Sequence, residues 1–126
     1  MRRGFTLVEL TLVVILIAIL AALALPQFTR MKERGKMAAA KAKLDVCRKA
    51  EGIWHAINDT YTNSFDDLDD EVPEAAEASL DDADWDFSIL AADATSFTIQ
   101  AKRRRGNYTG KTITIDQDGT ITDYAL

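Results

Sequence analysis

The chain begins with an almost uninterrupted run of apolar residues. Residues 10–25 contain no charged side chain, and almost all of the charge lies beyond Pro26. At a rise of ~1.5 Å per residue, a helix from Phe5 to Leu25 would be about 31 Å long, close to the ~30 Å hydrocarbon core of a bilayer. We therefore expect this segment to be able to span a membrane.

A helical pattern continues beyond Pro26. Apolar or small side chains recur every three or four residues, which is the spacing of one helix face. This predicted stripe consists of Phe28, Met31, Gly35, Ala39, Ala42, Val46, Ala50, Ile53 and Ile57. Pro26 has no amide hydrogen, so we expect it to loosen or bend the helix near the membrane exit. Asn58 and Asp59 are expected to end the helix.

The C-terminal part of the chain alternates with the period of two that is typical of half-buried strands. The alternating runs are residues 85–91, 96–102, 111–115 and 120–125. Turns are expected at 93–94, at 105–110 and at Asp118-Gly119, and the last is a strong hairpin signal. An acidic connection, residues 59–84, is expected to contain a short turn at 64–68 and a helical turn at 73–78.

A long helix followed by a meander of strands predicts an α+β fold. We expect three or four antiparallel strands to pack on the apolar stripe of the second half of the helix. A helix over residues 5–58 would be ~80 Å long, and the rest of the chain can cover only its second half. Lipid or other helices must cover the first half, which argues for a bundle of many copies.

Charge is segregated along this acidic chain of 126 residues and net charge −5. Residues 30–49 hold eight basic and two acidic side chains, residues 50–101 hold fourteen acidic ones without Lys or Arg, and residues 102–126 hold five basic and three acidic ones. This order predicts complementary surfaces, within the fold or between copies, or else a solvated acidic loop. The acidic balance argues against nucleic-acid binding.

Glu9 is the one charge within the apolar N-terminal segment. A carboxylate inside a membrane helix costs about 2.5–3.5 kcal/mol on insertion scales, so it marks a candidate functional site whose partner should be named. Cleavage between Gly4 and Phe5 would create a positive α-amino group four residues before Glu9. The competing interpretations of residues 1–26 are a secretory signal peptide cleaved near residues 22–24 and a plain transmembrane anchor.

The segment Arg3-Gly4-Phe5-Thr6-Leu7-Val8-Glu9 resembles the class III signal of type IV pilins and pseudopilins, and the resemblance continues to Pro26-Gln27-Phe28. The close match covers about residues 2–30. It implies that a prepilin peptidase cuts after Gly4 and methylates the new N-terminal Phe5. It also implies a leader (residues 1–4), a transmembrane and filament-core helix (5–26) and a pilin globular domain (27–126).

The resemblance implies a structural subunit of a type IV pilus-like filament, serving adhesion, motility or a related surface function, and not an enzyme. Glu9 would pair with the Phe5 terminus of an adjacent copy. The implied partners are other copies of the chain, membrane lipid before assembly, the prepilin peptidase, and an inner-membrane assembly platform with its ATPase. The precursor would cross the bacterial inner membrane once, and the filament would be periplasmic or extracellular.

Two alternatives stay open at this point. Cys47 is the only cysteine, so the C-terminal disulfide of many type IV pilins cannot form, which favours a type II secretion pseudopilin or a short pilin. From a different class, the chain could be a membrane-anchored or secreted small binding protein. We expect Cys47 itself to be a small buried hydrophobe, with an intermolecular disulfide as the alternative.

The remaining candidate chemistry is sparse. The single histidine, His55, excludes any metal site that needs two, and no catalytic constellation is found. Asp116 and Asp118 precede Gly119 as in the start of a calcium loop, but no Glu follows at the required distance. A tight hairpin turn is the preferred interpretation, so we expect no cofactor, with calcium as the minority alternative. Arg103–Arg105 could form a solvated tip, contact an acidic segment of a neighbouring subunit or, as a weaker choice, bind DNA.

Overall fold

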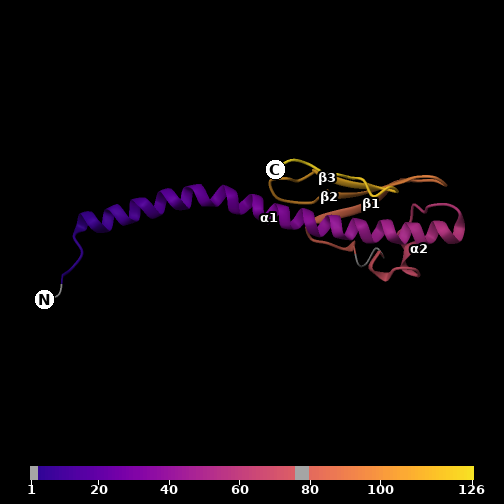
Figure 1. The fold of residues 1–126 in the computed structure, drawn as a ribbon, viewed down its shortest axis with the longest axis horizontal. Helices are drawn as coiled ribbons and strands as arrows, with labels where there is room; N and C mark the ends of the chain where they lie inside the picture. The colour runs from indigo at the N-terminus through magenta and orange to yellow at the C-terminus, as the bar shows by residue number, and fades with distance from the viewer. Residues whose placement is uncertain (1–2, 76–79) are drawn as a thin grey trace. The chain divides into compact units, whose positions relative to one another are not determined.

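The computed structural model describes residues 3–75 and 80–126, and part of the helical turn expected at 73–78 lies outside them. The helices are α1 (Leu7–Asn58), α2 (Asp66–Asp69) and the 3-10 helix η1 (Pro73–Ala75), and the strands are β1 (Trp85–Ala92), β2 (Phe97–Arg103), β3 (Thr112–Asp116) and β4 (Ile121–Thr122) (Figure 1). The chain divides into two compact units, Met1–Gly35 and Lys36–Leu126. The predicted α+β fold is confirmed.

Local signals set both ends of α1. At its start, the Thr6 N–H donates to Glu9 Oε2 at 2.8 Å and the Glu9 N–H donates to Thr6 Oγ1 at 3.1 Å. This reciprocal pair is a capping box, and it makes Leu7 the first helical residue instead of Phe5. At the other end, Asp59 has a φ of 58° and its N–H donates to the His55 carbonyl at 2.8 Å. A left-handed residue of this kind ends a helix, as predicted for Asn58-Asp59.

The first unit contains the apolar half of α1. By length and composition α1 is suited to crossing a membrane, and none of its most apolar 18-residue window is buried. Pro26 lies inside the helix, which continues through it. Because Pro26 has no N–H, the Ala22 carbonyl lacks its usual helical partner. Nearby, Thr29 Oγ1 donates to the Leu25 carbonyl at 3.2 Å.

The second unit is built on a four-stranded antiparallel sheet with the order β1-β2-β3-β4. Ile89 pairs with Ile99, and Ile99 pairs with Ile115, so apolar side chains line up across three strands. The register shifts between Ile89 and Ala91. The four predicted strands are confirmed, although β4 is shorter than the predicted run 120–125.

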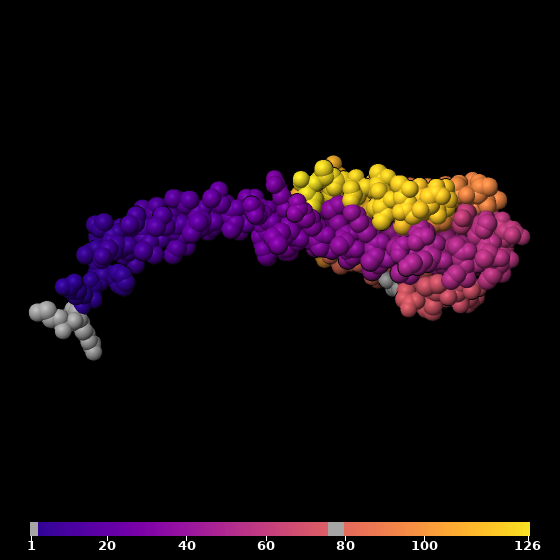
Figure 2. Space-filling view, in the orientation of Figure 1, coloured from indigo at the N-terminus to yellow at the C-terminus, as the bar shows by residue number. Residues whose placement is uncertain are grey.

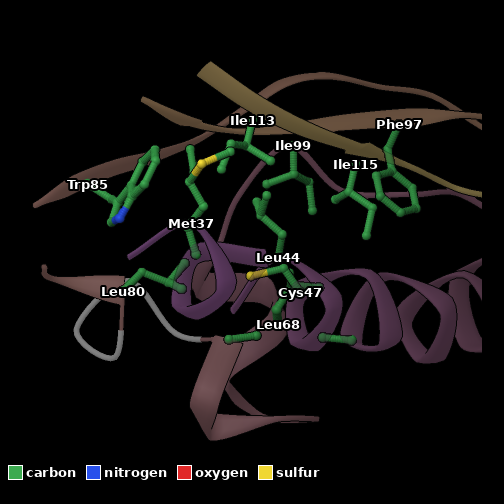
Figure 3. Packing of buried hydrophobic residues seen from close by; sticks show 14 residues of the cluster. Met37, Leu44, Cys47, Leu68, Leu80, Trp85, Phe97, Ile99, Ile113 and Ile115 are labelled. Carbon is green, nitrogen blue, oxygen red and sulfur yellow. The ribbon is translucent and has the colours of Figure 1, made fainter. Parts of the chain in front are cut away.

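The core lies between this sheet and the second half of α1 (Figure 3). Alternate residues of β2 and β3 point inward, and the remaining contributions come from α2, η1 and the start of β1. The buried residues are Met37, Ala40, Leu44, Cys47 and Ala50 of α1, with Leu68, Ala75, Leu80, Trp85, Phe97, Ile99, Ala101, Ile113 and Ile115. Each large side chain buried here contributes about 1.5–3 kcal/mol.

The predicted stripe of α1 was wrong. Of its nine residues only Ala50 is buried, whereas Ile53 is 41% and Ile57 62% exposed. Two faces of this alanine-rich helix keep three- and four-residue spacing, and the sheet covers the face that carries Met37, Ala40, Leu44 and Cys47. Within the globular unit, Ala39, Ala42, Ile53 and Ile57 of the predicted stripe form an exposed second face of the helix, and Val46 is partly buried against the core.

The C-terminal segment packs along α1 in the globular unit. Figure 2 shows the last residues, in yellow, lying directly on the helix. Lys41 forms an ion pair with Asp123, and the Arg48 side chain lies 3.5 Å from the position a Cβ would take on Gly119. The Tyr108 and Tyr124 rings stack with centroids 5.7 Å apart.

Candidate processing and assembly site

The expected cleavage bond lies ahead of the first helical turn. Gly4 and Phe5 precede the Thr6 cap, are not part of α1, and are exposed. A Cβ built on Gly4 would meet no atom within 4 Å, so the packing of this chain does not require glycine there.

Glu9 lies in the first turn of α1 and is exposed. Its Oε2 atom accepts the hydrogen bond from Thr6, and Oε1 accepts none from the described residues. Neither hydrogen bond of the capping box uses an atom of residues 1–5, so cleavage before Phe5 would leave the box intact. This box was not among the features predicted from the sequence, although a Thr-x-x-Glu pattern ahead of an apolar run is its recognised signal.

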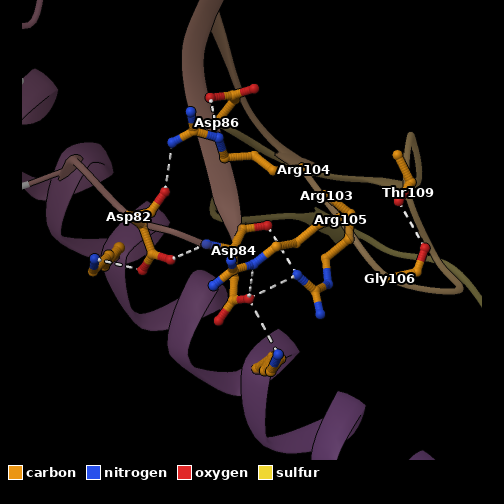
Figure 4. Close-up of polar contacts among 10 residues, drawn as sticks. Asp82, Asp84, Asp86, Arg103, Arg104, Arg105, Gly106 and Thr109 are labelled. Carbon is orange, nitrogen blue, oxygen red and sulfur yellow. Dashed lines mark hydrogen bonds and ion pairs between the residues drawn. The ribbon is translucent and has the colours of Figure 1, made fainter.

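The arginine triplet and the aspartates before and within β1 pair inside the fold (Figure 4). Asp84 Oδ1 lies 3.1 Å from Lys36 Nζ, 3.2 Å from an Arg103 guanidinium nitrogen and 3.4 Å from Arg105 Nε. Lys36, with Arg103, lowers the pKa of Asp84 below its ordinary value. The Arg103 side chain is 3% exposed and lies 5.3 Å from the centroid of the Trp85 ring.

The neighbouring residues follow the same arrangement. Arg104 lies 3.2 Å from Asp86 and donates to the Asp82 carbonyl at 2.8 Å, while Asp82 pairs with Lys43 at 3.0 Å. The triplet is only partly a solvated tip: Arg103 is buried, whereas the Arg104 and Arg105 side chains are 43% and 68% exposed. The expected contact with an acidic segment of a neighbouring subunit stays a prediction. The charge alternation is matched in this region within the fold, which was one of the alternatives left open by the sequence.

Asp116 and Asp118, the candidate calcium ligands, lie in a hairpin turn. Asp116 Oδ1 accepts hydrogen bonds from the N–H groups of Asp118 at 3.0 Å and Thr120 at 2.9 Å, and Gly119 has a φ of 82°. These contacts form the tight hairpin turn preferred from the sequence. Within residues 3–75 and 80–126, no group of three or more His, Cys, Asp or Glu side chains is placed to hold a metal ion.

Cys47 and His55 lie on the second half of α1. Cys47 is fully buried, as predicted, and burial together with nearby Glu51 raises the pKa of its thiol to about 12. An intermolecular disulfide is not compatible with this position in the folded unit. His55 is partly buried and packs against Tyr61 with ring centroids 4.4 Å apart.

Glu51 is a fully buried carboxyl group that was not predicted from the sequence. It has no exposed surface, its Oε2 atom accepts the Thr62 N–H at 3.0 Å, and Oε1 has no partner among the described residues. Burial raises the pKa of Glu51 to about 7. Thr62 in turn donates its hydroxyl to Asp67, so Glu51 anchors the chain where it leaves α1.

Comparison with known proteins decides the family. The family model of the prokaryotic N-terminal methylation motif matches residues 1–25. The type IV wide pilus major component PilA4 of Thermus thermophilus is 32% identical over 108 residues, which cover 82% of this chain and 76% of that protein. The chain belongs to the type IV pilin family. This pilin is also 38% identical over 67 residues to the type IV major pilin protein PilA of Myxococcus xanthus, a match that covers 53% of the pilin and 30% of that protein.

Family membership makes the pilin a structural subunit of a type IV pilus, a class of protein that assembles with copies of itself. A match to PilA4 over 82% of the chain extends well beyond the N-terminal segment, so it includes most of the globular unit. Both relatives are named as pilus subunits, and they do not favour the pseudopilin or small-binding-protein alternatives. The motif and the apolar half of α1 fit a membrane-anchored precursor.

Proposed function

We propose that the pilin is cleaved between Gly4 and Phe5, held in the inner membrane by α1, and polymerised through the apolar half of α1 into a pilus. The observation that carries this proposal is the exposure of that half: its large hydrophobic side chains from Phe5 to Leu25 are 48–87% exposed. Soluble monomers rarely expose an apolar patch larger than a few hundred Å². Lipid covers this surface before assembly, and the helices of other copies cover it afterwards.

Glu9 gives the assembly its register. In the proposed filament, its carboxylate pairs with the new α-ammonium group at Phe5 of an adjacent copy. Oε1 is available for this contact because the capping box uses only Oε2. The pairing gives each buried charge an opposite charge, whereas a lone buried carboxylate would oppose packing of the helices.

The exposed second face of α1 supplies further contact area. Ile53 and Ile57 lie on the part of α1 whose opposite face is buried in the core. Apolar side chains left in water here gain by contact with another copy, at roughly 25 cal/mol per Å² buried. The globular unit would therefore contribute to the polymer alongside the apolar N-terminal half.

The proposed partners and locations follow from this route. A prepilin peptidase removes residues 1–4 and methylates Phe5, and an inner-membrane platform with its ATPase assembles the mature chain, whose segments are the helix 5–26 and the domain 27–126. The precursor crosses the inner membrane once, with the domain outside, and the assembled filament is periplasmic or extracellular. We propose that no cofactor takes part.

N-terminal mass spectrometry of the mature chain tests the processing step. A chain that begins at N-methylated Phe5 supports the proposal. A chain that begins near Leu25 would indicate a secretory signal peptide, and an intact Met1 would indicate a plain anchor. Either result contradicts the proposed route.

A further inference from the structure

The eight basic side chains of residues 30–49 fall into two groups. Five form ion pairs within the globular unit, namely Lys36 with Asp84, Lys41 with Asp123, Lys43 with Asp82, and both Arg48 and Lys49 with Asp45. The other three, Arg30, Lys32 and Arg34, are exposed and form no ion pair with the described residues. We call these three residues the basic collar.

The collar presents charge on opposite sides of α1. At about 100° per residue, Arg30 and Arg34 lie on one side of the helix and Lys32 on the other. The Lys32 ammonium lies 5.9 Å from the centroid of the Phe28 ring, four residues earlier. Glu33, the only acidic residue of this segment, is 5% exposed. The exposed charge of residues 30–34 is therefore positive and suits a ligand that surrounds the helix.

The collar also lies at the right height for a membrane surface. Arg30 and Arg34 follow Leu25 by five and nine residues, or about 7 and 13 Å along a helix. The headgroup layer extends roughly 5–8 Å beyond the hydrocarbon core on each side. Long basic side chains bend back along the helix toward such a layer, so all three cationic groups can reach the level of the lipid phosphates.

We propose that Arg30, Lys32 and Arg34 bind the phosphates of anionic phospholipids while the pilin is in the membrane. Lipid headgroups surround a spanning helix, whereas a single acidic partner protein would contact only one side of the collar. The proposal rests on the membrane-anchored precursor of the proposed function and does not depend on polymerisation.

The test compares lipid retention by the full-length chain in native mass spectrometry from mixed micelles of phosphatidylglycerol and phosphatidylcholine. The collar variant R30Q/K32Q/R34Q is matched by the control K41Q/R48Q/K49Q, which loses the same charge from side chains that pair within the chain. We expect wild type and control to prefer phosphatidylglycerol. In the collar variant, the preference for phosphatidylglycerol over phosphatidylcholine should fall about fivefold for each charge removed, and roughly a hundredfold for all three. Circular dichroism shows whether each variant is folded, and added salt should weaken the wild-type preference.

Several results would overturn the proposal. A folded collar variant that keeps its preference would exclude the collar as the site, and an equal loss in the folded control would show a general effect of net charge. Glycerol 3-phosphate that displaces phosphatidylglycerol at matched ionic strength would indicate a site for free phosphate. Collar-dependent self-association without anionic lipid would indicate a second copy as the partner. The lipid measurement uses the unpolymerised chain. If cells that make the chain had no pili, the proposed function would be contradicted, but the measured preference for phosphatidylglycerol would not change.

Discussion

Thr6 and Glu9 bind each other at the start of α1 through two reciprocal hydrogen bonds of 2.8 and 3.1 Å. The carboxylate that we assign to assembly is thus positioned before it meets another copy. Both bonds lie downstream of the Gly4–Phe5 bond, so the proposed cleavage would add a positive charge next to a site that is already ordered. The precursor and the mature chain can share the same helix start.

Replacing Glu9 by glutamine should separate processing from assembly. The amide can still accept the Thr6 hydrogen bond, but it cannot pair with an ammonium group, so we expect normal cleavage and little or no filament. Thr6→Ala is the matched control, because it weakens the cap by about 1 kcal/mol and keeps the charge. N-terminal mass spectrometry and the yield of sheared fibres measure the two steps. Normal filaments from Glu9→Gln would remove the proposed role of the carboxylate.

Burial of Glu51 should make stability depend on pH. Its pKa is raised from 4.5 to about 7 in the folded state. The folded state therefore binds the Glu51 proton more tightly than the unfolded state does. The stabilisation from this proton is fully present below about pH 4.5 and is lost as the pH rises through about 7. Glu51→Gln should lose less stability than wild type between pH 5 and 8. Urea unfolding of the full chain in micelles, followed by tryptophan fluorescence, measures the difference. The exposed Glu74→Gln should follow the wild-type profile, and an unchanged profile for Glu51→Gln would contradict the expectation.

Asp84→Asn should destabilise the globular unit by roughly 1–3 kcal/mol near neutral pH. The substitution removes the negative charge that Lys36, Arg103 and Arg105 share, and Arg103 is buried. Because the pKa of Asp84 is lowered in the folded state, its contribution is present above the ordinary value of 3.8. The difference from wild type should shrink as the pH falls through the folded pKa. The exposed Asp81→Asn is the control, and equal losses of unfolding free energy in both variants would contradict the central role of Asp84.

The two apolar faces of α1 should respond differently to truncation. Leu44→Ala removes a fully buried side chain and should cost about 2–5 kcal/mol of unfolding free energy. Ile57→Ala, on the exposed face, should change the stability of the subunit by less than ~0.5 kcal/mol. If that face packs against another copy, Ile57→Ala should still reduce the yield of fibres. Unaltered fibres from a stable Ile57→Ala chain would exclude the face from the polymer.

Features that depend on neighbouring residues in the sequence could be predicted. The charge-free run before Pro26 predicted the apolar half of α1, and period-two alternation predicted the four strands, because burial on one face imposes these patterns directly. Choosing the buried face of α1 failed at Ala39 and Ala42, where two faces carry small side chains at the same spacing. Sequence spacing alone does not say which of these faces the sheet will cover.

Features that depend on tertiary proximity could not be predicted in the same way. Asp84 and Arg103 are nineteen residues apart, and only the pairing of β1 with β2 brings them within 3.2 Å. A glutamate on a helix is normally solvated, so nothing in the sequence around Glu51 indicated that it would be buried and would bind the Thr62 N–H. The Thr6–Glu9 box was different, because its local signal was present in the sequence.

Electron microscopy of sheared surface material tests the central claim most directly. Cells with the pilin, cells without it and complemented cells should be compared, with mass spectrometry of the purified fibres. We expect fibres that contain this chain beginning at N-methylated Phe5, that disappear on deletion and that return on complementation. Cells that express the pilin without fibres, or fibres that persist unchanged without it, would contradict the account.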